Sequence, residues 1–83
     1  MNWFKKRKLK KHIKGLNWDL IEKDINYKIG GEYAALKWLK AYVEGRATYE
    51  PKELFEASLN RCDMDEVDIK WQRPFLRTLY KWI

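Results

Sequence analysis

The residues best placed to do chemistry are the cations gathered at the start of the chain. Residues 1–15 hold seven of the 18 Lys and Arg residues and no acidic one, so the remainder carries 11 basic against 12 acidic residues. The net charge of +6 therefore comes from this one segment. Clustered cations neutralise phosphates and release condensed counterions, with little sequence preference. The predicted phosphate contacts are Lys5, Lys6, Arg7, Lys8, Lys10, Lys11 and Lys14.

Three kinds of partner suit such a basic segment. Nucleic acid, either DNA or RNA, is favoured, because lysines act as point charges that position a protein on phosphates more than they read bases. The alternative partner is an acidic or nucleic-acid-binding protein, which this chain would inhibit or regulate as a small interaction module. The third is an anionic membrane surface, with Trp3 and Phe4 as interfacial anchors. Neither aromatic joins the apolar stripe of the segment, which weakens the membrane interpretation.

Residues elsewhere in the chain extend this hypothesis. Arg73, Arg77 and Lys81 are spaced by four near the end of the chain, on one predicted helix face, and would enlarge the phosphate-binding surface. Trp3 lies outside any apolar stripe and Trp38 lies off the main stripe of its predicted helix, so each is a candidate for stacking on a base or for an interface. The competing interpretation places Trp38 in the core.

Catalytic and metal-binding patterns are not supported by the sequence. A calcium loop starting at Asp63 would need Gly at its sixth position and Glu at its twelfth, where the chain has Asp68 and Pro74. The only histidine, His12, has no Cys or acidic residue near it in sequence, and Cys62 has no histidine near it. Helix capping accounts for the acidic run, and a buried position accounts for Cys62. We therefore expect no enzymatic activity, no cofactor and no metal site.

Length and composition indicate one small globular domain. The chain has 83 residues, of which 46% are hydrophobic and 36% charged, with five Trp, five Tyr and three Phe to fill a dense core. A single cysteine suits a reducing compartment, and no apolar run approaches the ~18 residues of a membrane span, so a cytoplasmic protein is expected. The predicted organisation is a basic N-terminal arm over residues 1–14 and a helical domain over residues 15–83.

Apolar residues recur with a helical period along most of the chain, and four Gly and two Pro leave little room for long loops. The predicted fold is all-α, a small bundle of four to five short helices. The first three helices are expected near residues 5–14, 17–29 and 32–44, and Leu9, Ile13, Leu16 and Leu20 share one stripe. A fourth helix is expected to start at Pro51 and a last one near Asp63.

Pro74 interrupts the last predicted helix, because proline removes a backbone donor and clashes with the carbonyl four residues earlier. A kink or a break is expected there. A break would leave Val67, Ile69 and Trp71 alternating with polar residues, as in a strand. The alternative fold is therefore α+β, with a short two-stranded sheet formed by residues 25–29 and 67–71.

Overall fold

The computed structural model describes residues 2–28, 30–61 and 66–83, and the side chains of residues 66–71 are outside this description. The described residues form helices and no strand, which confirms the predicted all-α bundle. The six helices are α1 (Trp3–Gly15), α2 (Trp18–Lys23), α3 (Ile25–Lys28), α4 (Gly31–Val43), α5 (Pro51–Asn60) and α6 (Glu66–Tyr80).

The alternative two-stranded sheet is wrong for the residues that the structure describes. Residues 25–28 form α3 and residues 67–71 belong to α6, while Ile29 lies outside the description. The α6 helix runs through Pro74 without a break, so the segment before the proline never becomes a separate strand. An interior proline costs a helix about 3 kcal/mol. The packing of α6 between α4 and α5 offsets that cost.

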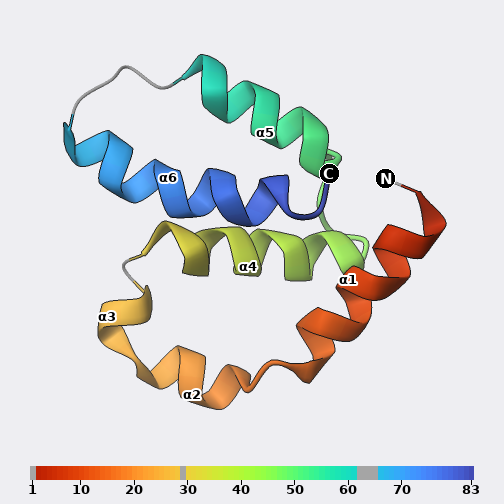
Figure 1. Ribbon diagram of the computed structural model, residues 1–83. Helices are drawn as coiled ribbons and strands as arrows, with labels where there is room; N and C mark the ends of the chain where they lie inside the picture. Colours follow the sequence, from red (N-terminus) through yellow and green to blue (C-terminus); the bar gives the residue numbers. More distant parts are fainter. Residues whose placement is uncertain (1, 29, 62–65) are drawn as a thin grey trace.

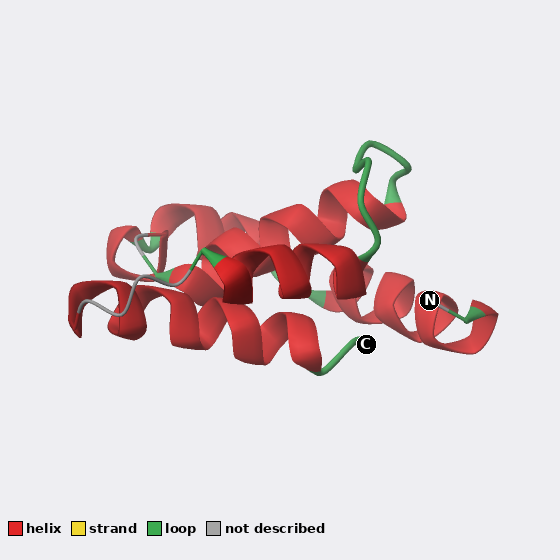
Figure 2. Ribbon diagram, turned by 90° about the horizontal axis from the view of Figure 1, so that it is seen from above, coloured by secondary structure: helices red, strands yellow, loops and turns green. Residues whose placement is uncertain are grey.

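The helices form a flattened body with α4 near its centre. Figure 1 shows α4 and α6 side by side and running in the same direction, with α5 returning along the far side of α6. The first helix crosses the C-terminal end of α4, and α2 and α3 lead the chain back to the start of α4. The body measures 35 × 30 × 19 Å. Seen from above, the first turns of α1 project beyond the other helices (Figure 2).

The core lies where α1, α4 and α6 meet. Leu9, Leu39 and Leu79 come from these three helices and are fully buried. Burying a side chain of this size stabilises the fold by roughly 1.5–3 kcal/mol. The whole buried cluster comprises Leu9, Ile13, Leu36, Leu39, Tyr42, Leu79 and Trp82. The predicted division between a basic arm and a helical domain is not tested by these contacts, but Leu9 and Ile13 do belong to this common core.

Local signals in the sequence set several helix ends. Asn17 caps α2 by accepting a hydrogen bond from the Leu20 backbone N–H at 3.3 Å. Gly45 follows α4 with a φ of 80°, a left-handed conformation that side chains disfavour. It places the Arg46 N–H 2.8 Å from the carbonyl oxygen of Ala41, which closes the end of the helix.

The single helix predicted for residues 17–29 is wrong, because Asp24 divides it into α2 and α3. Asp24 adopts an extended backbone, and its side chain accepts a hydrogen bond from the Tyr27 N–H at 3.1 Å. It thereby caps a new helix instead of continuing the old one. The predicted apolar stripes fail here too, since Leu20 is 65% exposed and Ile25 is 73% exposed.

A carboxylate joins α2, α3 and α4. Both oxygens of Glu22 accept from the Tyr33 hydroxyl at 3.0 Å, and the carboxylate pairs with the ammonium groups of Lys28 and Lys37 at 3.4 Å. The Tyr33 hydrogen bond, followed by those of the two lysines, lowers the pKa of Glu22 below its ordinary value. This group therefore holds the α2–α3 segment against α4 when it is ionised.

Acid is expected to weaken the fold through Glu22. Its pKa is lower in the folded chain than in the unfolded one, so its contribution is complete above the ordinary value of 4.5 and disappears as the pH falls through the lower folded value. Thermal unfolding midpoints between about pH 6 and 3 should therefore fall less steeply for Glu22→Gln than for wild type. Glu53→Gln, an exposed site on α5, is the control and should follow wild type. Equal acid sensitivity of Glu22→Gln and wild type would contradict this prediction.

Candidate nucleic-acid interface

All seven cations predicted to contact phosphates lie on α1 and are exposed. Leu9 and Ile13 anchor the helix, so the cations are held on its remaining surface. The Glu50 carboxylate interacts electrostatically with Lys6, while the ion pairs of Glu22 and Glu44 involve cations outside α1. The first helix itself contains no acidic residue. Most of its positive charge is therefore directed at solvent.

One flank of α1 faces the C-terminal end of α4 across two adjoining depressions. The first has a volume of about 380 Å³ and is lined by Trp3, Lys6, Arg7, Lys10 and Val43. The second has a volume of about 180 Å³ and is lined by Lys10, Ile13, Lys14, Trp18, Lys40, Val43 and Glu44. Lys10 and Val43 line both, so the two depressions adjoin. We call them together the α1–α4 groove.

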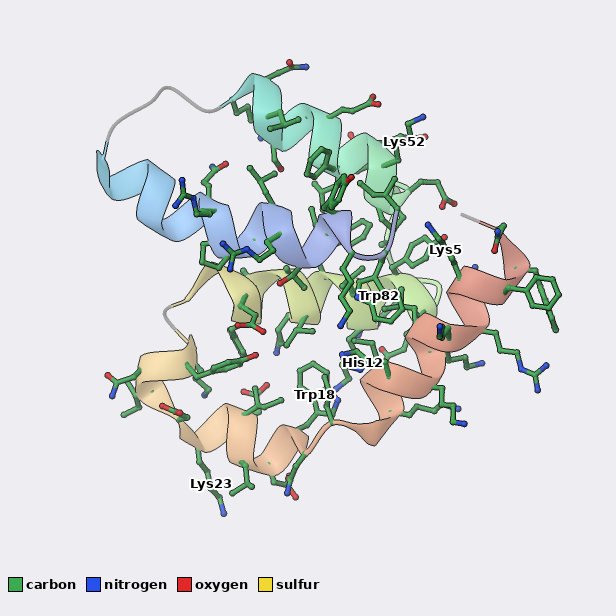
Figure 3. All side chains as sticks on the ribbon, in the orientation of Figure 1. Lys5, His12, Trp18, Lys23, Lys52 and Trp82 are labelled. Atoms are coloured by element: carbon green, nitrogen blue, oxygen red, sulfur yellow. The ribbon has the colours of Figure 1, made fainter. Side chains whose placement is uncertain are left out.

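The two tryptophans of the groove have different environments. Trp18 is half-buried, its indole Nε1 donates to the Ile13 carbonyl oxygen at 3.0 Å, and the Lys40 ammonium lies 4.7 Å from its ring centre. Figure 3 shows its ring turned inward, whereas Lys23 of α2 points away from the body. Trp3 is 63% exposed, with the Arg7 guanidinium 5.3 Å from its ring centre. Trp18 therefore forms part of the wall of the groove, whereas the ring of Trp3 is accessible to a ligand in the groove.

The opposite flank of α1 faces the end of α6. The Lys5 ammonium donates to the carbonyl oxygen of Ile83, and the His12 ring lies 5.4 Å from the buried Trp82 ring. Figure 3 shows Lys5, His12 and Trp82 on this side. The Lys81 ammonium lies 5.6 Å from the same Trp82 ring. Lys81 and His12 of α1 therefore lie beside the same indole ring.

Two other predicted contacts lie apart from this flank. Arg73 and Arg77 are exposed on earlier turns of α6. No hydrogen bond, ion pair or ring contact links either residue to the described residues of α1. Their participation in one surface with α1 stays a prediction.

Trp38, the other predicted stacking residue, packs against the core and is half-buried. Its ring stacks on Tyr42 with a centre distance of 5.6 Å and an angle of 11°. Tyr42 in turn donates its hydroxyl to Glu50 at 2.6 Å, and the Lys6 ammonium lies 5.1 Å from the Tyr42 ring centre. Burial, followed by the bond to Glu50, raises the pKa of Tyr42 to about 12. The Tyr42 hydroxyl is therefore neutral at physiological pH. A stacking role for Trp38 stays a prediction.

Sequence reasoning missed part of the groove. It did not select Trp18, Lys40 or Val43 as candidate site residues. The sequence signal is the spacing of Lys40 and Val43, one turn apart at the end of α4. That spacing becomes informative only once the crossing of α1 over α4 is known. Glu44 also lines the groove, and it forms an ion pair with Arg46.

Some predicted features fall outside the described residues. These are the buried position of Cys62 and the capping role of the acidic run from Asp63 to Asp68, of which only the backbone of residues 66–68 is described. Across the described helices, none is both long and apolar enough to span a bilayer.

No family model, curated protein or solved structure matches this chain. The functional assignment therefore rests on the geometry and charge of the surface formed by α1 and its neighbours.

Proposed function

We propose that this chain is a small, non-enzymatic cytoplasmic protein that binds nucleic acid, and that α1 contacts the phosphates. The observation that carries the proposal is the surface of α1, which exposes seven cations and contains no acidic residue. Each cation that neutralises a phosphate releases a condensed counterion, which favours binding without reading sequence. Lys40 and Lys81 add positive charge beside α1, near Trp18 and Trp82 respectively.

The position of α1 in the fold also supports this proposal. Because Leu9 and Ile13 fix the helix to the core, its cations need little further ordering on binding, and less conformational entropy is lost. The same burial counts against the membrane alternative. A helix that inserts its apolar face into a bilayer needs that face free, and here the core occupies it.

A protein partner is the second candidate, and the exposed aromatic pair at the start of α1 favours it. Trp3 and Phe4 meet edge to face with ring centres 5.0 Å apart, and both are exposed. Tryptophan is among the residues that dominate protein interfaces. Recovery of one partner protein after nuclease treatment, with no measurable affinity for nucleic acid, would favour this candidate.

A salt series with the wild-type protein tests the proposed function. The affinity for labelled single-stranded and duplex DNA, measured by fluorescence anisotropy, should fall steeply as salt rises. A log–log slope of about −4 to −6 is expected, since five to seven neutralised phosphates each contribute roughly 0.7–0.9. Absence of binding to either DNA at about 50 mM salt, where electrostatic attraction is little screened, would overturn the proposal.

A further inference from the structure

We propose that the α1–α4 groove binds a single strand of nucleic acid, with one base stacked against Trp3 and consecutive phosphates along α1. This inference rests on the proposed function and specifies its ligand and its site. A strand held in this way would enter beside Trp3 and run toward Trp18, along the line of the two depressions.

Trp3 supplies a surface that only an unstacked base can use. It borders the larger depression, of about 380 Å³, and 63% of its surface is exposed. A volume of this size falls within the range of ~300–1,000 Å³ of small-molecule pockets. Bases in a duplex are stacked on one another, whereas bases of a single strand can turn outward onto an aromatic ring. The Arg7 guanidinium above the indole adds a cation beside such a base.

The cations along the groove suit the backbone of one strand. Lys6, Lys10 and Lys14 recur every four residues on the flank that faces α4, so their positions advance by about 6 Å at each step. Consecutive phosphates of one strand are separated by a similar distance. Lys40 faces them from the opposite wall, over the ring of Trp18. A strand in the groove would therefore meet positive charge on both sides.

The two ends of the groove differ in what they offer. The ring of Trp18 is half-buried and its indole N–H is bonded to the Ile13 carbonyl oxygen, so it is a poorer stacking surface than Trp3, which is 63% exposed. Glu44 also borders that end, and its ion pair with Arg46 reduces its repulsion of phosphates. Base stacking is therefore assigned to the Trp3 end, and phosphate contacts to the length of α1.

Two matched double variants test the groove. Lys10→Gln/Lys14→Gln removes two cations that line it, and Lys8→Gln/Lys11→Gln removes two from α1 that line neither depression. None of the four lysines makes a hydrogen bond, ion pair or ring contact with a described residue, so both variants should fold like wild type, as circular dichroism would show. Binding of a labelled 12-nucleotide oligothymidylate is measured for each. At about 0.1 M salt the groove variant should lose roughly tenfold or more in affinity. The Lys8→Gln/Lys11→Gln variant removes the same charge outside the groove, and its loss should be smaller by at least about threefold.

Single substitutions test the stacking. Trp3→Ala should weaken oligothymidylate binding by roughly 5- to 150-fold, the equivalent of ~1–3 kcal/mol per stacked base, without changing the salt slope. Tyr49→Ala, which changes an exposed aromatic residue that lines a separate depression, should bind like wild type. Trp3→Ala should leave binding to a 12-base-pair duplex unchanged.

The outcomes separate this inference from the proposed function. Three results would each overturn the groove assignment. The two double variants could lose affinity equally, Trp3→Ala could bind as tightly as wild type, or wild type could bind duplex and single strand with equal affinity. In each of these cases a steep salt slope of the wild type would still support phosphate binding by α1. If wild type binds neither probe at about 50 mM salt, both proposals are wrong.

Discussion

Replacing the seven Lys and Arg residues of α1 with Gln is expected to remove nearly all affinity for nucleic acid. Binding at about 0.1 M salt should fall by at least 100-fold, and the log–log salt slope should move from about −4 to −6 toward zero. The reason is that these side chains carry the excess positive charge of the chain and lie on a helix that contains no acidic residue. Fluorescence anisotropy across a salt series measures both the affinity and the slope.

Substitution is the appropriate change, because removal of residues 1–14 would also remove Leu9 and Ile13 from the core. Glutamine has a helix propensity close to that of lysine, and the loss of like charges relieves repulsion along α1. A control variant neutralises Lys23, Lys52 and Arg61, three exposed cations outside α1. It should keep the wild-type slope to within about one unit. The prediction would be contradicted if the α1 variant bound nucleic acid as tightly as wild type. It would also be contradicted if the control lost as much affinity per charge removed as the α1 variant.

The helical character of the chain was predictable because local sequence and tertiary packing agree over most of its length. Leu9 and Ile13, Leu36 and Leu39 fall on helical stripes in the sequence, and the same residues form the core. Asn17, Gly45 and Pro51 mark helix ends by their backbone chemistry alone, and each does so in the structure.

Sequence prediction is least precise where one local signal competes with another or with tertiary packing. In residues 17–29 the helical period favours one helix, but the Asp24 side chain binds the Tyr27 backbone N–H and starts another. At Pro74 the sequence predicts a kink or a break, and packing against two helices carries α6 through the proline without a break. Neither the strength of a capping bond nor the extent of packing can be read from periodicity.

The candidate site was predictable only in part. Charge is a property of sequence, so the cations of α1 were found directly. The groove depends on the crossing of α1 over the end of α4, which brings Lys40 and Val43 beside Lys10 although they are 30 or more positions apart. The same crossing separates Lys10 and Lys14, which face α4, from Lys8 and Lys11, which do not line the groove.

Leu9→Ala is expected to cause the largest loss of stability in this region, and it tests whether the basic segment is part of the folded body. Leu9 of α1 is fully buried in the core. Truncating a buried leucine to alanine lowers the free energy of unfolding by about 2–5 kcal/mol. That is a large share of the ~4–12 kcal/mol expected for a domain of this size. The midpoint of thermal unfolding, followed by circular dichroism, should fall by roughly 10–20 °C or more.

The control for Leu9→Ala is Lys8→Ala, which changes the preceding exposed residue and should alter stability by less than about 0.5 kcal/mol. If α1 were a detached tail, the two variants would unfold alike, near the wild-type midpoint. If α1 is anchored as in the structure, Leu9→Ala should also weaken binding of oligothymidylate, although it removes no charge. The cations would then have to be ordered during binding instead of being held in place beforehand by the core. Loss of affinity at constant charge would therefore show that the fold, as well as the net charge, contributes to the interaction.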